Sequence, residues 1–260
     1  MLKMNGFRLA NKLLLGASLI VGAAAPTFAS VTLGGTRVIL GEQDREASIP
    51  VKNAGHAPYV IQAWIDAGEG KTKTPFVVTP PLSRLDPGME NILRIMRISN
   101  NLPTDRESVF WLNVKEIPEK SREDNVLQIA MRTRIKLFYR PSALQGKSTE
   151  SRHQLKWAVL PGQNNQNSVL KIENPTPYHV TFTSLKINQG QQEINADMVP
   201  PMGQLVYSLT SAKIQNSIDV RFTTLNDYGG ETPEERATVP VAANPIAIPI
   251  EPVATLTVKQ

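Results

Sequence analysis

Short runs of apolar and β-branched residues recur along this chain, separated by glycine, proline, asparagine and aspartate. Such runs, bounded by turn-forming residues, are typical of β-strands, whose side chains alternate between two faces. The twenty prolines and the lack of a sustained apolar period of about 3.6 residues argue against long helices. We therefore expect an all-β chain of β-sandwiches, with strands at residues 36–40, 47–51, 59–65, 92–98, 109–114, 126–139, 168–172, 180–187 and 217–225.

The first residues have the pattern of a secretory signal peptide. Lys3, Arg8 and Lys12 give a positive start, residues 13–22 are apolar, and Thr27-Phe28-Ala29 places small residues where a signal peptidase would cleave. The apolar run is too short to span a bilayer, so we favour a cleaved peptide at 1–29 over a membrane anchor. No later segment has the length of a membrane helix, and we expect a secreted protein without a membrane span.

The net charge, the lack of cysteine and the few histidines narrow the range of possible ligands. Removal of residues 1–29 takes away three basic residues and no acidic ones, so the formal net charge falls from +5 to +2. This charge gives no support to a nucleic-acid partner. There is no cysteine, and His56, His153 and His179 are far apart and expected at the surface. We therefore expect no disulfide, no metal site and no cofactor.

The chain is expected to divide into two domains just after Arg140-Pro141. Residues 142–153 are small and polar without periodicity, which suits a loop that joins domains. The expected domains are residues 30–145 and 146–240, each of a size normal for one sandwich. Residues 241–260 form a proline-rich extension, either a segment that covers a sheet edge or a loose tail, and residues 254–259 could add a last strand.

The run at residues 126–139 carries apolar side chains on both faces. Leu127, Ile129 and Met131 share the odd face, and Lys136 belongs to the even face. From the residues alone, the odd face is the strand's own core and the even face is solvated.

Several segments, in this order, resemble the periplasmic chaperones of the chaperone–usher pilus pathway. The resemblance covers about residues 32–230 with gaps, and the combination is specific where each piece alone is weak. It is carried by residues 79–88 (TPPLSRLDPG), 105–114 (DRESVFWLNV) with 116–118 (EIP), 126–141, 174–178 (NPTPY) and 226–230 (NDYGG).

This resemblance implies two immunoglobulin-like β-sandwich domains in an L-shape with a cleft between them. It implies a periplasmic chaperone that binds, folds and caps pilus subunits, then delivers them to an outer-membrane usher during fimbrium biogenesis. The subunit would accept a strand from the chaperone, in donor strand complementation. Leu127, Ile129 and Met131 would then be donated side chains, exposed in the free protein, and the exposed strand could also pair with a second copy.

The resemblance further implies that Arg37 and Lys136 grip the terminal carboxylate of the subunit. A guanidinium fork and an ammonium group can satisfy a carboxylate with charge-assisted hydrogen bonds. Lys136 lies on the even face whereas the donated residues lie on the odd face, so a bulge or strong twist near residues 132–134 would reconcile the two.

By the same resemblance, Glu107, Arg140 and Asp227 tie the two domains together; from the residues alone they are three surface charges. The short segment at residues 118–125 marks the short-loop class of these chaperones. The cysteine pair found in some members is absent, so the second domain must be held by packing.

Two other functions compete with this hypothesis. A secreted pilus structural subunit or adhesin domain is the main alternative, although no N-terminal donor extension or cysteine is evident. A periplasmic hydrolase on a β-sandwich is the third, but no carboxylate pair, nucleophile motif or phosphate-binding glycine loop stands out. We therefore expect no catalytic residues and no enzyme activity.

Overall fold

The computed structural model describes residues 31–120, 125–161, 168–210, 214, 216–241 and 246–253. The expected signal peptide and the expected last strand at residues 254–259 lie outside these residues. The regular elements of the described chain are strands, apart from the 3₁₀ segments η2 (Ser148–Gln154) and η3 (Asn188–Gly190). Within the described ranges, no helix is long and apolar enough to cross a membrane.

The first domain is a sandwich of two sheets. One sheet has the order β1-β3-β7-β5, and the other has the order β2-β9-β8-β4-β6. Their inner faces enclose one apolar core, in which Leu40, Ile61, Leu93, Leu112 and Leu137 are fully buried. The strands are β1 (Val31–Leu33), β2 (Arg37–Gly41), β3 (Glu46–Asn53), β4 (Tyr59–Asp66), β5 (Phe76–Thr79), β6 (Leu82–Leu85), β7 (Glu90–Arg97), β8 (Ser108–Pro118) and β9 (Arg132–Arg140).

The second domain is also a sandwich with its own core. Its sheets have the orders β15-β11-β10-β18 and β13-β12-β16-β17-β19, with β14 beside β12. Trp157, Phe182 and Phe222 pack edge-on or tilted against one another in the core between them. The strands are β10 (Lys156–Leu160), β11 (Ser168–Asn174), β12 (Val180–Ile187), β13 (Gln192–Glu193), β14 (Met198–Val199), β15 (Gly203–Leu209), β16 (Ser217–Thr224), β17 (Glu235–Pro240), β18 (Ile246–Ala247) and β19 (Glu251–Pro252).

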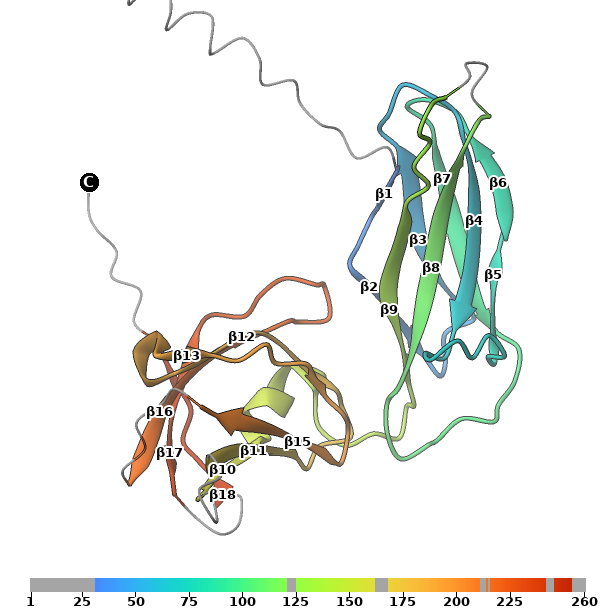
Figure 1. The fold of residues 1–260 in the computed structure, drawn as a ribbon. Coiled ribbons are helices and arrows are strands. Elements are labelled where there is room, and N and C mark those ends of the chain that lie inside the picture. Colours follow the sequence, from blue (N-terminus) through green and yellow to red (C-terminus); the bar gives the residue numbers. More distant parts are fainter. Residues whose placement is uncertain are drawn as a thin grey trace, which may run out of the picture.

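The two sandwiches are set at an angle, and the second lies beside one end of the first (Figure 1). Each has a separate cluster of buried apolar residues. The expected all-β fold with two sandwich domains is therefore confirmed.

The expected joining loop at residues 142–153 is wrong in its second half. Residues from Ser148 onward form η2, in which Ser151 is fully buried and Arg152 contacts the buried Glu235 at 3.1 Å. The polar side chains of Ser151 and Arg152, which were expected in a solvated loop, instead pack this segment against the second domain. In the proline-rich extension, β18 pairs with β10 and β19 pairs with β17, so its described part covers sheet edges.

One strand of the first domain is only partly covered along its edge. The chain leaves β1 in one sheet and enters β2 in the other, where residues Arg37–Gly41 pair in parallel with Lys136–Arg140 of β9. On that side, no described strand pairs with residues 132–135. The covered and open parts of β9 therefore meet at Lys136.

The expected strand at 126–139 is shorter in the structure, because β9 begins at Arg132. Met131 still accepts a hydrogen bond from the backbone of Glu116 on β8, but residues 126–131 have no regular strand structure. The ladder between β8 and β9 runs from Ser108↔Tyr139 to Lys115↔Arg132 without a register shift. The bulge that would have reconciled the two faces is therefore absent over this ladder.

Candidate binding site along strand β9 and between the domains

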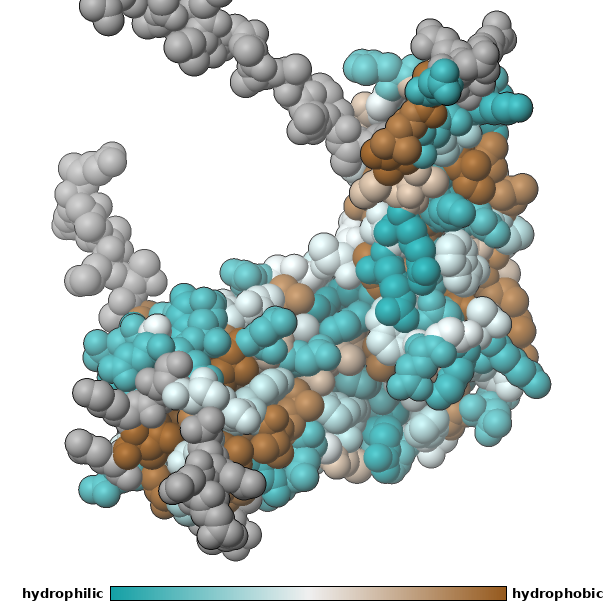
Figure 2. Space-filling model, viewed as in Figure 1, coloured by the Kyte–Doolittle hydropathy of each residue, from teal (hydrophilic) through white to brown (hydrophobic). Residues whose placement is uncertain are grey.

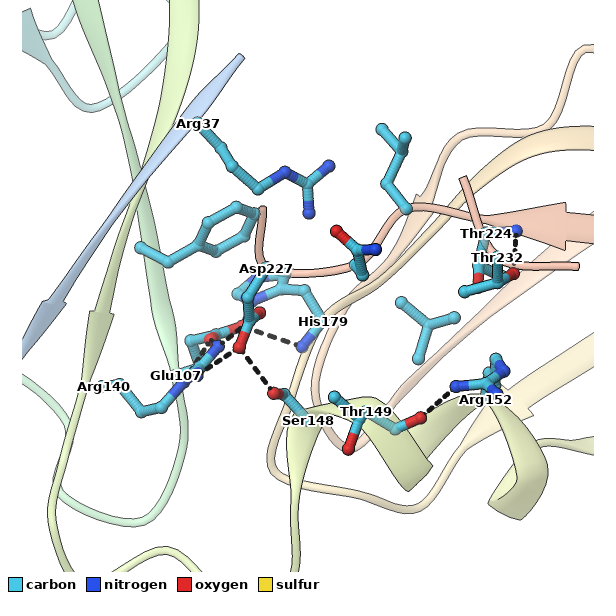
Figure 3. Close-up of a pocket in the computed structure, with 14 residues that line it drawn as sticks. Arg37, Glu107, Arg140, Ser148, Thr149, Arg152, His179, Thr224, Asp227 and Thr232 are labelled. Atoms are coloured by element: carbon cyan, nitrogen blue, oxygen red, sulfur yellow. Dashed lines mark hydrogen bonds and ion pairs between the residues drawn. The ribbon is translucent and has the colours of Figure 1, made fainter. Parts of the chain in front are cut away.

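Two cations face each other at the beginning of β2. Arg37 of β2 is the direct partner of Lys136 of β9, and its guanidinium carbon lies 5.6 Å from the ring centre of Phe138. Both side chains are half-buried, yet neither forms an ion pair with a described residue. Figure 3 shows the Arg37 guanidinium pointing into the space between the domains, with no bond drawn to it.

Burial lowers the pKa of both Arg37 and Lys136. Desolvation lowers the pKa of Arg37, although Asp227 and Glu107 act in the opposite direction. Desolvation also lowers the pKa of Lys136, and the nearby charge of Arg37 adds to that effect while Asp197 opposes it. The Arg37 Nε is buried without a hydrogen-bond acceptor among the described residues. Two desolvated cations with an unused buried donor form a site suited to an anion such as a carboxylate.

A row of apolar side chains precedes β9 and is exposed. Leu127 is 85% exposed, Ile129 66% and Met131 57%. Farther along the same face, Ile135 and Leu137 are buried in the core of the first domain. Figure 2 shows apolar side chains at the end of the first domain where the chain approaches β9. The core of the first domain does not contain this row. Strand donation would require such exposure in the free protein.

A second charged group joins the domains. Arg140 donates hydrogen bonds to Glu107 Oε1 at 2.8 and 3.0 Å, and to both carboxylate oxygens of Asp227 at 2.8 and 3.0 Å. Glu107 and Arg140 belong to the first domain, and Asp227 follows β16 in the second. Figure 3 shows Arg140 between the two carboxylates. The structure thus brings together all three residues that the sequence singled out.

Burial and pairing work against each other in this group. Desolvation lowers the pKa of Arg140, but hydrogen bonds and charges of Asp227 and Glu107 outweigh it and raise the pKa. Burial raises the pKa of Asp227, but hydrogen bonds from Arg140 and Ser148 outweigh it and lower the pKa. Both shifts favour the charged forms of Arg140 and Asp227. The Arg140 guanidinium is bonded to carboxylates of both domains, whereas Arg37 forms no ion pair with a described residue.

Sequence reasoning missed His179, which was expected at the surface. Its side chain is only 6% exposed, and its Nδ1 lies 2.7 Å from Glu107 Oε2. The same oxygen accepts the His179 backbone N–H at 3.0 Å. His179 is buried because the turn before β12 packs against the first domain, where the Phe138 ring lies 5.4 Å away. The adjoining motif at residues 174–178 was the available signal, since Pro177 accepts the Glu107 N–H at 2.9 Å.

The described residues hold no group of three or more histidine, aspartate or glutamate side chains that could bind a metal ion. Four residues of the short loop, 121–124, lie outside the described chain, so the short-loop class stays a prediction.

Comparison with known proteins agrees with this architecture. Residues 30–145 match the family described as pili and flagellar-assembly chaperone, PapD N-terminal domain. Residues 150–236 match the pili assembly chaperone PapD, C-terminal domain. The chain therefore belongs to the PapD-like family of pilus assembly chaperones. Its class is that of a chaperone, which is not an enzyme class, and a structural pilus subunit is not favoured.

Named relatives point in the same direction. The chain is 42% identical over 233 residues to the probable fimbrial chaperone LpfB of Escherichia coli O157:H7, covering 88% of this chain and 94% of that protein. The crystal structure of the YadV chaperone has a TM-score of 0.70 at 35% identity and covers 81% of this chain and 100% of that one. A Salmonella enterica structure of SafA pilin in complex with the SafB chaperone has a TM-score of 0.70 at 28% identity, covering 83% of this chain and 99% of that one.

Proposed function

We propose that this protein works in the periplasm, where it captures pilus subunits by adding the segment around residues 126–135 to their incomplete sheet. The carrying observation is the continuity of two features along β9. An exposed apolar row leads along an open strand edge to a pair of cations that have no carboxylate partner among the described residues. The signal-peptide pattern and the family support the periplasmic location.

Each part of this edge has a distinct task in the proposal. Open backbone groups of residues 132–135 would hydrogen-bond a subunit strand, and Leu127, Ile129 and Met131 would fill its apolar groove. Arg37 and Lys136 would bind the terminal carboxylate of that strand, which fixes its register. A strand that ends at Lys136 and extends back toward residue 127 runs parallel to β9.

The two faces of β9 need no bulge to cooperate. A terminal carboxylate belongs to the backbone and can reach cations on the outer face. The apolar row lies on the opposite side and serves side chains of the subunit. Glu107, Arg140, Asp227 and His179 would hold the second domain at the angle that leaves this edge accessible.

We assign binding alone to the site, since it offers cations and apolar side chains rather than a nucleophile paired with a base. Transfer of the captured subunit to an outer-membrane usher completes the proposed role, on the strength of the family. Pairing of the exposed edge with a second copy would be a competing use of the same surface.

The direct experiment is subunit capture by Arg37→Ala and Lys136→Ala variants. Each protein is purified from periplasmic extracts, and co-purified subunits are quantified by mass spectrometry. We expect loss of capture with little change in melting temperature, because neither cation has an ion-pair partner among the described residues.

Arg94→Ala and Lys52→Ala are matched controls, because both residues are exposed on the other sheet of the same domain. Their capture should equal that of the wild type. Wild-type subunit yield from both Arg37→Ala and Lys136→Ala would refute the carboxylate anchor.

A further inference from the structure

The outer face of the β2-β9-β8-β4-β6 sheet carries a second ordered set of cations. Arg132 lies with its guanidinium carbon 5.1 Å from the ring centre of Trp64, and Arg134 lies 4.5 Å from that of Trp111. Both arginines remain substantially exposed, at 48% and 38% of their side chains. Figure 2 shows polar side chains over β9 and β8 on this face.

A buried polar pair holds these arginines in place. Asp66 accepts a hydrogen bond from Arg134 at 2.7 Å and one from Asn113 at 2.7 Å. The Asn113 Oδ1 accepts the Arg132 Nε at 2.9 Å. Burial raises the pKa of Asp66, but the bonds from Arg134, the Gly68 backbone and Asn113 outweigh it and lower the pKa.

A glycine packs closely against the ring of Trp111. Gly68 has φ of +84°, and a Cβ added there would stand 3.0 Å from the Trp111 ring. Glycine therefore allows the backbone to approach the Trp111 ring closely at the place where Arg134 stacks on it. A guanidinium stacked on an aromatic ring and fixed by hydrogen bonds loses little conformational entropy when it binds a ligand.

This face has more positive than negative charge. Lys115, Arg132, Arg134, Lys136 and Arg37 follow β8, β9 and β2 on it, by the alternation of strand side chains. Among the described residues near the two arginines, Asp66 is their ion-pair partner and is shared between them at 2.7 and 3.6 Å. Outward N–H groups of both arginines thus remain available to an acidic ligand.

The spacing links this set to the proposed carboxylate anchor. Arg134 and Arg132 stand two and four residues before Lys136, on the same face of the strand. A strand that pairs with the open edge of β9 and ends at Lys136 presents every second side chain on this face. Its alternate side chains would therefore pass beside Arg134 and then Arg132.

We propose that Arg132 and Arg134 determine specificity by binding acidic side chains at alternate positions of the terminal strand of a pilus subunit. This inference rests on the proposed function, because the register is set by the carboxylate anchor. Arginine and tryptophan are the residue types enriched where interfaces concentrate their binding energy. If the arginines only covered the two rings, the side-chain pattern of the partner would not matter.

The test uses the full mature chain and synthetic strand-forming peptides with a free C-terminal carboxylate. One peptide carries two glutamates at every second position back from its end, an isomer has both shifted by one residue, and a third has glutamine in their place. We expect one glutamate register to bind about fivefold more tightly than the glutamine peptide, with a gain that salt reduces. The other register should show no gain, because a shift by one residue turns the glutamates to the opposite face.

Variants then test whether Arg132 and Arg134 cause the tighter binding of the glutamate peptide. The Arg132→Gln/Arg134→Gln double variant should bind all three peptides alike, and Arg132→Lys/Arg134→Lys, which preserves charge, should retain part of the gain. Arg84→Gln is the matched control, because Arg84 lies on β6 at the far edge of the same sheet and pairs with Asp86 at 2.8 Å. Melting curves and tryptophan fluorescence check that each variant is folded.

Equal affinity of the three peptides for the wild type would overturn this inference, as would an unchanged gain in the double glutamine variant. Failure of the proposed function has a different signature. In that case no peptide binds the wild type, or the glutamine peptide binds the Arg37→Ala variant as tightly as the wild type.

Discussion

Arg37 and Arg140 are the same residue type on neighbouring strands, yet their surroundings differ. Arg140 donates to acceptors from Glu107 and Asp227, whereas the buried Arg37 Nε has no acceptor among the described residues. Alternation along the sequence assigns Lys136 to the outer face, as the structure has it. It cannot say which cation finds a carboxylate, because Arg140 and Asp227 are joined only by the packing of two domains.

The lowered pKa of Asp66 predicts that the free energy of unfolding depends on pH in the acid range. A carboxyl whose pKa is lower in the folded than in the unfolded chain stabilises the fold while ionised, above the ordinary aspartate pKa of about 3.9. That contribution is lost as pH falls through the folded pKa. We expect Asp66→Asn to lower the free energy of unfolding by roughly 1–3 kcal/mol at neutral pH, with a smaller difference from wild type in acid. Urea unfolding measured across pH gives both numbers.

Asp44→Asn is the comparison for this prediction, because Asp44 is exposed in a turn of the same domain and bonds only the Gly41 backbone among the described contacts. A constant stability difference between Asp66→Asn and wild type from acid to neutral pH would contradict the role given to the ionised carboxyl.

At the scale of the element, the apolar pattern located nine of the nineteen described strands, six in the first domain and three in the second. It missed β1 and the short strands β5 and β6, which Pro80-Pro81 separate, and in the second domain it missed β10, β13, β14, β15, β17, β18 and β19. In β15, Gly203 and Gln204 begin the strand and Ser208 breaks the apolar residues, so no apolar run long enough to mark a strand stands out. The pattern also extended β9 too far, since hydrophobicity alone does not reveal that a strand has lost its neighbour.

The odd face of this segment predicts two opposite outcomes for similar mutations. Changing Leu127, Ile129 and Met131 together to threonine should leave the melting temperature nearly unchanged, because all three are exposed. Subunit capture should fall at least tenfold, because the groove of the partner loses its apolar filling. Ile135→Ala should do the reverse and cost about 2–4 kcal/mol of stability, because Ile135 is buried.

Thermal unfolding and co-purification on the same preparations separate these effects. A large loss of stability in the triple threonine variant would mean that the row belongs to the core of the free protein, as the residues alone had suggested.

At the scale of the whole molecule, two independent cores are joined through a small charged interface. Arg140→Ala would leave the buried Glu107 carboxylate without its cation, and we expect a loss of about 3 kcal/mol in the coupling between domains. Small-angle X-ray scattering should show a broader distribution of shapes, while each core still unfolds cooperatively. Arg106→Ala removes the partly exposed arginine that precedes Glu107 in the chain and pairs with Asp105 at 2.7 Å, and it should leave the scattering unchanged. Equal scattering from both variants would exclude a role for Arg140 in fixing the angle.

The parallel pairing of β2 with β9 also limits what can lie on this edge. No described strand pairs with this edge up to residue 135, and β2 pairs with it from Lys136 onward, so β2 would block the path of any strand that arrives from the open side. A polypeptide that continued past that point would have to leave the sheet beside two desolvated cations. If the proposed anchor holds, we expect this edge to accept the end of a polypeptide chain in preference to an internal segment.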